Sequence, residues 1–215
     1  MSATQVKSFA SLDSLLSPGR LRVILLSQRV LYWPIRLITH LLPHRTRVNL
    51  QPGDISPDHC YIVAANHQSM FDPFIICVAL PPGILAGLAP LRFFAHNALF
   101  DKFLRHFLFA FGAFPASANA SYIYGLTAAQ LFLKHHQSIM IFPEGKRTPH
   151  KIRPRSGIEV LAKTPQVKII PVHIEWCRGR WLWPSYAITV GKPLEAAEKL
   201  TALQILNRIY RLPIE

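Results

Sequence analysis

Short apolar runs recur along the chain, and segments with helical periodicity lie between them. Continuous apolar runs of a few residues are typical of strands buried on both faces of a sheet. We predict strands at 60–65, 91–95, 138–142, 167–174 and 186–190. Helices are predicted at 99–111, 121–136, 157–163 and 200–211. Strands that alternate with helices indicate an α/β fold, here a single domain with a mixed, mostly parallel sheet flanked by helices.

Residues 73–91 are uncharged and mostly apolar, so this stretch must be weighed as a membrane span. Proline and glycine interrupt it at Pro73, Pro81, Pro82, Gly83, Gly87 and Pro90. A proline inside a helix removes one amide donor and clashes with the preceding turn, so one continuous helix is disfavoured. We predict a short helix that ends near Leu80 and is followed by a loop.

Residues 20–43 combine short apolar runs with arginines at 20, 22, 29 and 36. No uncharged apolar run in this segment approaches the ~20 residues that a membrane-spanning helix needs. The pattern predicts an amphipathic segment of two helical pieces, hinged near Pro34, that lies in the membrane interface. The alternative is an ordinary amphipathic helix packed on its own domain. We therefore divide the chain into an N-terminal interfacial segment, residues 1–50, and a main domain, residues 51–215.

Charge and hydrophobicity together point to a membrane surface. The 215-residue chain has 24 Lys and Arg against 11 Asp and Glu, a net charge of +13, and half of its residues are hydrophobic. This balance indicates an anionic membrane surface rather than nucleic acid as partner, and no regular aromatic interleaving of the kind that stacks bases is present. Three cysteines without metal-ligand spacing favour a reducing compartment. We expect a peripheral or monotopic protein at the cytoplasmic face of the cell membrane, and its oligomeric state is left open.

The first chemically suggestive stretch runs from Asn66 to Asp72, in the sequence NHQSMFD. It follows the predicted strand 60–65 and precedes Pro73, a residue favoured at the start of a helix. Asp72 therefore occupies an N-cap position, and His67 lies in the turn at the C-terminal end of a strand. There the Asp72 carboxylate can hold one imidazole nitrogen and leave the other free to accept a proton. The alternative is a capping aspartate beside an unrelated loop histidine.

A second stretch, FPEGKRT at 142–148, follows another predicted strand. An acid, a glycine and two bases at the end of a strand predict a loop that handles anions. Lys151, Arg153 and Arg155 extend the basic run. We interpret these three residues either as contacts to phosphate groups or as a solvated basic loop.

Together the two blocks resemble the glycerolipid and lysophospholipid acyltransferase family, the 1-acylglycerol-3-phosphate O-acyltransferase-like enzymes. The first family signature is Asn-His, four residues and Asp; the third is Phe-Pro-Glu-Gly, then a basic residue and Ser or Thr. The order of the blocks and their separation of roughly 75 residues fit that family. By this resemblance the catalytic residues are His67 and Asp72. The substrate-binding residues that it implies are Asn66, Glu144, Gly145, Lys146 and Arg147.

The chain departs from the family pattern at the second signature. In relatives this signature closes with an arginine that contacts the phosphate of a glycerol phosphate acceptor. The equivalent segment here is 112–118, and Ala118 stands where the arginine is expected. Either Arg92, Lys102 or Arg105 substitutes for it, or the acceptor carries no phosphate. We favour the second interpretation.

The resemblance implies transfer of a fatty acyl group from acyl-coenzyme A or an acyl carrier protein to a hydroxyl of a lipid or lysolipid acceptor. His67 would act as general base, and Asp72 would fix its tautomer and stabilise the imidazolium. No acyl-enzyme, metal or cofactor beyond the acyl donor is expected, and the Gly-x-Ser-x-Gly nucleophile elbow is absent. Two alternatives stay open: a thioesterase or other hydrolase that uses the same pair, and a non-enzymatic basic membrane-surface protein.

Overall fold

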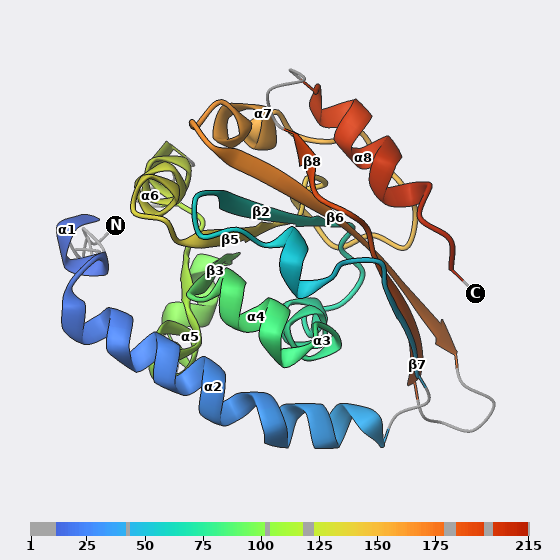
Figure 1. Ribbon diagram of the computed structural model, residues 1–215, viewed down its shortest axis with the longest axis horizontal. Coiled ribbons are helices and arrows are strands. Elements are labelled where there is room, and N and C mark those ends of the chain that lie inside the picture. The colour runs from blue at the N-terminus through green and yellow to red at the C-terminus, as the bar shows by residue number, and fades with distance from the viewer. Residues whose placement is uncertain are drawn as a thin grey trace, which may run out of the picture.

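An eight-stranded sheet forms the centre of the molecule (Figure 1). The computed structural model describes residues 12–41, 44–101, 104–117, 123–178, 184–195 and 200–214. The strands are β1 (His44–Val48), β2 (Cys60–Ala65), β3 (Leu91–Ala95), β4 (Ala113–Pro115), β5 (Ser138–Ile141), β6 (Val167–Arg178), β7 (Pro184–Val190) and β8 (Leu194–Glu195). The α-helices are α1 (Leu12–Leu15), α2 (Pro18–His40), α3 (Asp72–Ala79), α4 (Pro82–Leu88), α5 (Arg105–Phe111), α6 (Ile123–Lys134), α7 (Gly157–Ala162) and α8 (Ala202–Tyr210). Two short 3₁₀ helices, η1 (Pro52–Asp54) and η2 (Asn97–Asp101), complete the described elements.

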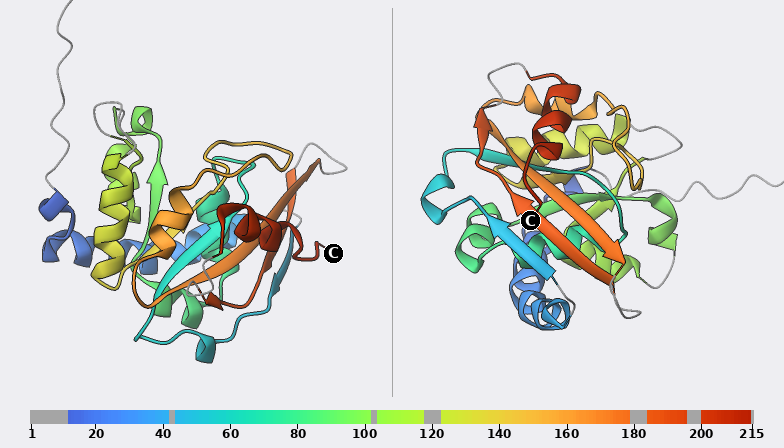
Figure 2. Two further views of the ribbon diagram at one scale, coloured as in Figure 1. Left: turned by 90° about the horizontal axis from the view of Figure 1, so that it is seen from above. Right: turned by 90° about the vertical axis from the view of Figure 1, so that its right-hand side faces the viewer.

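The strand order is β1-β7-β6-β2-β5-β3-β4, with β8 paired to β6. Strands β6, β2, β5, β3 and β4 pair in parallel, whereas β7 runs antiparallel to β6 and pairs in parallel with β1 (Figure 2). The predicted α/β fold with a mixed, mostly parallel sheet is therefore confirmed. Because parallel strands end at a common edge, the loops that follow β2 and β5 lie side by side.

Helices cover both faces of the sheet, which explains why β2 is apolar along its whole length. Alternate side chains of a strand point to opposite faces. Tyr61 and Val63 face the core formed with α2, α3, α4 and α5, whereas Ile62 and Ala64 face the core formed with α6, α7 and α8. Figure 1 shows these two layers, with α3, α4 and α5 on one side of the sheet and α6, α7 and α8 on the other.

Helix α2 is continuous from Pro18 to His40 and passes through Pro34, so the expected hinge at Pro34 is wrong. Proline removes only one backbone hydrogen bond, and a helix tolerates that loss where its packing continues on both sides. Tyr32, 4% exposed, precedes Pro34 on the buried face, and Thr39, 6% exposed, follows it. The packing of this face therefore holds the helix together across the proline.

The outer face of α2 is apolar as well. Val23, Leu26, Val30, Trp33 and Leu37 are each more than half exposed. Their spacing of three and four residues places them on one stripe of the helix. Arg22 and Arg29, also exposed, flank this stripe.

Some elements differ from the sequence-based expectation. The stretch after Leu80 contains helix α4 rather than a loop, because its prolines stand at the start of the helix, where proline is tolerated. Strands β1 and β4 were not predicted: β1 is charged and lies at the sheet edge, and β4 has only three residues. The predicted helix 99–111 is divided into η2 and the shorter α5.

Two further points concern the N-terminal half. None of the helices in the described ranges is long and apolar enough to cross a membrane. Strand β1, which precedes the expected boundary at residue 50, is hydrogen-bonded to β7 in the same sheet as the main domain.

Candidate active site

His67 and Asp72 meet in the turn between β2 and α3. The Nδ1 atom of His67 lies 2.8 Å from Oδ2 of Asp72. The His67 side chain is 18% exposed, whereas that of Asp72 is fully buried. The ring of Phe142 stacks on the imidazole with 4.0 Å between the centroids. With Nδ1 engaged, Nε2 has no bonding partner among the described residues and can accept a proton from a substrate.

Asp72 begins α3 rather than capping it. The N-cap residue is Phe71, so the helix starts one residue earlier than expected. The carboxylate turns back toward the preceding loop, where Oδ2 accepts the backbone N–H groups of Gln68 and Ser69, both at 2.8 Å. Its other oxygen, Oδ1, accepts the indole N–H of Trp176 at 2.8 Å. The aspartate therefore holds the histidine and shapes the loop that carries it.

Asn66 was expected to bind substrate, but its side chain is fully buried and bonded within the protein. Its amide group donates to the carbonyl of Ile174 and accepts the Ile174 N–H, both at 2.7 Å. Two residues later the Gln68 side chain accepts the backbone N–H of Trp176 at 2.9 Å. The two side-chain amides thus continue, beyond the end of β2, the pairing between β2 and β6.

Glu144 is also buried, at 2% exposure, and both of its oxygens are occupied. Oε2 accepts the backbone N–H of His67 at 2.9 Å, and Oε1 accepts the hydroxyl of Tyr210 at 2.8 Å. Burial and the neighbouring Glu144 carboxylate raise the pKa of Tyr210 well above its usual value, so the phenol remains a donor. This arrangement suits a residue that positions the loop of His67, rather than one that contacts the acceptor.

The loop after β5 wraps around the histidine. Its Thr148 N–H donates to the carbonyl of His67 at 2.7 Å. Gly145 has a left-handed φ of 67°, and its N–H donates to the carbonyl of Phe142 at 2.9 Å, so that amide is not free for a substrate. Lys146 and Arg147 are exposed, and their amides have no acceptor within the described part of the chain. Of the expected substrate-binding residues, Gly145, Lys146 and Arg147 are exposed, whereas Asn66 and Glu144 are buried.

The basic residues considered as substitutes for the missing arginine differ in availability. Arg92 is 3% exposed and donates to Gln137 Oε1 at 2.7 Å and to the Leu15 carbonyl at 3.2 Å. Burial, together with nearby Arg20, lowers its pKa to about 10. Arg92 is therefore a structural residue. Arg105 lies exposed on α5.

Lys102, another possible substitute, and Ala118, which stands where the family has an arginine, lie outside the described residues.

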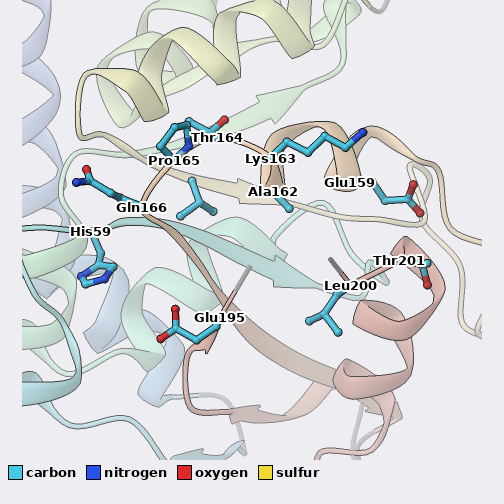
Figure 3. Close-up of a pocket in the computed structure, with 11 residues that line it drawn as sticks. His59, Glu159, Ala162, Lys163, Thr164, Pro165, Gln166, Glu195, Leu200 and Thr201 are labelled. Carbon is cyan, nitrogen blue, oxygen red and sulfur yellow. The ribbon is translucent and has the colours of Figure 1, made fainter. Parts of the chain in front are cut away.

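A cavity of about 630 Å³ lies elsewhere in the fold (Figure 3). Its lining includes His59, just before β2, and Gln166, just before β6. It therefore opens at the N-terminal ends of these strands, whereas His67 follows the C-terminal end of β2. The cavity is separate from the candidate site. Within the described ranges no group of three or more His, Cys, Asp or Glu side chains could hold a metal ion.

Trp176, Tyr210, Gln68 and Phe142 were not predicted to belong to the site. Trp176 and Tyr210 lie 104 and 66 positions from the acids that they contact. No local spacing in the sequence signals such contacts, because strand pairing and helix packing create them. Gln68 is part of the NHQSMFD block, and Phe142 opens FPEGKRT, so membership of these blocks was the available clue in the sequence.

The comparisons with known proteins give the family and the fold of the chain. Residues 46–175, well over half of the chain, match the family described as Acyltransferase. The chain therefore belongs to the acyltransferase family. In fold it is similar to the crystal structure of the 1-acyl-sn-glycerophosphate (LPA) acyltransferase PlsC from Thermotoga maritima, with a TM-score of 0.58 and 21% sequence identity. The similarity covers 92% of this chain and 81% of that one. No curated protein sequence matches the chain.

Proposed function

We propose that this protein is a lipid O-acyltransferase that moves a fatty acyl group from an acyl thioester to a hydroxyl of a lipid or lysolipid acceptor. The single observation that carries the proposal is the His67–Asp72 pair, bonded at 2.8 Å, with Nε2 of the imidazole open. Membership of the acyltransferase family supports the reaction class. The fold shared with an enzyme named as an LPA acyltransferase supports a lipid acceptor.

In the proposed mechanism His67 is the general base. The acceptor hydroxyl gives its proton to Nε2 while its oxygen attacks the thioester carbonyl carbon. When the carbon–sulfur bond breaks, the imidazolium returns the proton to the departing thiolate. Asp72 keeps the proton of the imidazole on Nδ1 and stabilises the imidazolium that forms. No acyl-enzyme, metal or cofactor beyond the acyl donor takes part.

The tetrahedral intermediate needs hydrogen-bond donors for its oxyanion. The exposed amides of Lys146 and Arg147 and the Arg147 side chain are the candidates in the loop that wraps around His67. Exposed bases at 151, 153 and 155 continue this loop and suit the phosphates of coenzyme A or the acidic surface of an acyl carrier protein. The proposal keeps the preference for an acceptor without a phosphate, since Ala118 stands where the family has an arginine and Arg92 is bonded within the protein. Exposed Arg105 is the described residue that could take the place of that arginine.

We further propose that α2 docks the enzyme on an anionic membrane surface, at the cytoplasmic face of the cell membrane. Its exposed stripe of large apolar side chains would enter the lipid interface, and the arginines beside the stripe would meet anionic headgroups. The net charge of +13 supports the same partner. The division into an N-terminal interfacial segment and an acyltransferase domain, with its boundary at residue 50, belongs to this proposal.

The function is tested by incubating the purified protein with radiolabelled acyl-coenzyme A or acyl carrier protein and a total lipid extract. We expect a labelled lipid with wild type and about 10²–10⁴-fold slower formation with His67→Ala. His135→Ala, which removes an exposed histidine at the other end of the sheet, serves as control and keeps full activity. The headgroup of the labelled lipid identifies the acceptor.

Two results would contradict the proposal. Release of free thiol and fatty acid without any labelled lipid would favour a thioesterase. Equal activity of His67→Ala and wild type would remove the histidine from the mechanism.

A further inference from the structure

Trp176 lies on the part of β6 that extends past its neighbour. Strand β2 ends at Ala65, opposite Val172. Strand β6 continues to Arg178, and its residues beyond Val172 pair with β7. The extension passes over the loop between β2 and α3. Its backbone is tied to that loop through the Gln68 side chain, which accepts the Trp176 N–H at 2.9 Å.

The indole ring is held on its other side by Tyr186 of β7. The two ring centroids lie 5.6 Å apart. The ring therefore has little freedom to turn, and its N–H group faces Asp72 at 2.8 Å. An indole nitrogen can only donate, so its natural partner is a carboxylate oxygen.

The two oxygens of Asp72 have different environments. Oδ2 receives His67 Nδ1 and the N–H groups of Gln68 and Ser69. Oδ1 receives the indole N–H of Trp176 and no other donor in the described part of the chain. Because Asp72 is fully buried, Oδ1 would otherwise be a buried acceptor without a partner. Such a group is costly, and the carboxylate could relieve the cost by rotating away from the histidine.

We propose that Trp176 is a positioning residue for the His67–Asp72 pair. Its indole N–H locks the rotation of the carboxylate, so that Oδ2 stays aligned with His67 Nδ1 throughout the reaction. This inference rests on the proposed function for its kinetic consequence, but the hydrogen bond itself can be tested without any activity. Strand β6 carries no residue of either sequence block. The inference gives this strand a direct part in the geometry of the catalytic pair.

The hydrogen bond is tested by NMR of protein labelled with ¹⁵N-tryptophan. The chain has four tryptophans, and Trp176→Phe identifies the indole signal of Trp176 by its loss. We expect this signal far downfield in wild type, as a donor to a charged oxygen should be, and moved upfield in Asp72→Asn. A Trp176 signal that is the same in both proteins would show that the indole does not bond to Asp72 and would overturn the inference, whether or not the protein transfers acyl groups.

The positioning role is tested by kinetics of Trp176→Phe, which keeps an aromatic ring but has no N–H. We expect kcat to fall about ten- to a hundredfold with KM within about twofold, because a hydrogen bond to a charged group is lost only at the catalytic pair. Benzothienylalanine at position 176, which has the shape of tryptophan with sulfur in place of N–H, should show the same loss. His135→Ala, the exposed control of the acyl-transfer assay, should stay near wild type.

Two kinetic outcomes would overturn the role while leaving the acyltransferase proposal intact. One is wild-type kcat in Trp176→Phe. The other is wild-type kcat in the benzothienylalanine protein combined with a loss in Trp176→Phe, since that pattern would assign the effect to ring packing.

Discussion

At the scale of single residues, two buried acids, Asp72 and Glu144, shape the site, and each of their carboxylate oxygens accepts a hydrogen bond. A buried carboxylate is stable only when hydrogen bonds replace the water that it loses. Asp72 and Glu144 both meet this condition, and both accept hydrogen bonds from the loop that carries His67. The two acids of the sequence blocks therefore both bond to one histidine, Asp72 to its ring and Glu144 to its backbone N–H.

The bond between Glu144 and Tyr210 gives the first prediction. We expect Glu144→Gln and Tyr210→Phe each to lower the free energy of unfolding by about 1–3 kcal/mol, because each leaves a buried polar atom unpaired. The double variant should lose less than the sum of the two, since both remove the same bond. Chemical denaturation in urea measures the three values. Asn207→Ala, which removes an exposed bond to Lys151 on the same helix, should cost far less.

The pH dependence of stability gives the second prediction. Cys77 is 3% exposed, and burial raises the pKa of its thiol from 9.0 to about 12. Since the folded-state pKa lies above the unfolded value, this stabilising contribution is complete below pH 9 and is lost as the pH rises toward about 12. We expect the free energy of unfolding to fall over that range, and to fall less steeply in Cys77→Ala. Parallel curves for the two proteins would contradict this assignment.

At the scale of elements, Gln28 is one of the side chains whose polar groups attach α2 to the domain, together with Tyr32 and Arg36. The amide of Gln28, 4% exposed, donates to the carbonyls of Leu91 and Phe111 at 2.7 and 2.9 Å and accepts the Leu91 N–H at 3.2 Å. Gly112 lies at the same contact, where a β-carbon would come within 2.7 Å of the Leu91 carbonyl. The helix therefore approaches β3 and the end of α5 more closely than larger residues would permit.

The third prediction concerns this attachment. Gln28→Ala leaves two carbonyls and an amide without partners in the protein interior, so we expect a loss of about 2–4 kcal/mol in the free energy of unfolding. Arg29→Ala, the neighbouring exposed position on the same helix, should change it by less than about 0.5 kcal/mol. Urea denaturation under identical conditions compares them. Equal stability of the two variants would show that Gln28 does not hold the helix.

Several elements followed directly from the sequence, and the reasons differ for those that did not. Strands β2, β3 and β5 are short apolar runs bounded by breakers, so period and composition suffice to find them. Strand β1 carries two arginines and becomes a strand only because β7 offers it a free edge. Helix α2 runs through Pro34 because packing on the domain outweighs a local preference.

At the scale of the whole molecule, the protein presents an apolar stripe on α2 and a basic loop beside the active site. The stripe carries the membrane proposal, because large apolar side chains exposed in a row are unusual on a soluble surface. The arginines beside it add attraction to anionic lipid. In the proposed function, these two features would serve the membrane surface and the acyl donor respectively.

The fourth prediction tests that interface. We expect the double variant Leu26→Glu/Leu37→Glu to bind vesicles of phosphatidylglycerol at least about tenfold more weakly, since it removes two leucines that would enter the lipid and adds two charges that anionic lipid repels. Its free energy of unfolding should stay unchanged, because both leucines are more than 60% exposed. Leu203→Glu on α8, also exposed, is the control. Added salt should weaken the binding of wild type. Equal binding of all three proteins would refute docking through α2.

The sequence by itself determined the class of fold, the two blocks that make the site and the His67–Asp72 pair, because these depend on periodicity and on residues close together in the chain. The burial and bonding of Asn66 and Glu144 required the tertiary structure, since their partners Ile174, Tyr210 and the backbone of His67 lie far from them in the sequence. Trp176 required it as well. Trp176 lies 104 positions from Asp72 in the sequence, and the extension of β6 past β2 brings the two side chains together. That extension depends on strand register, which no local pattern encodes.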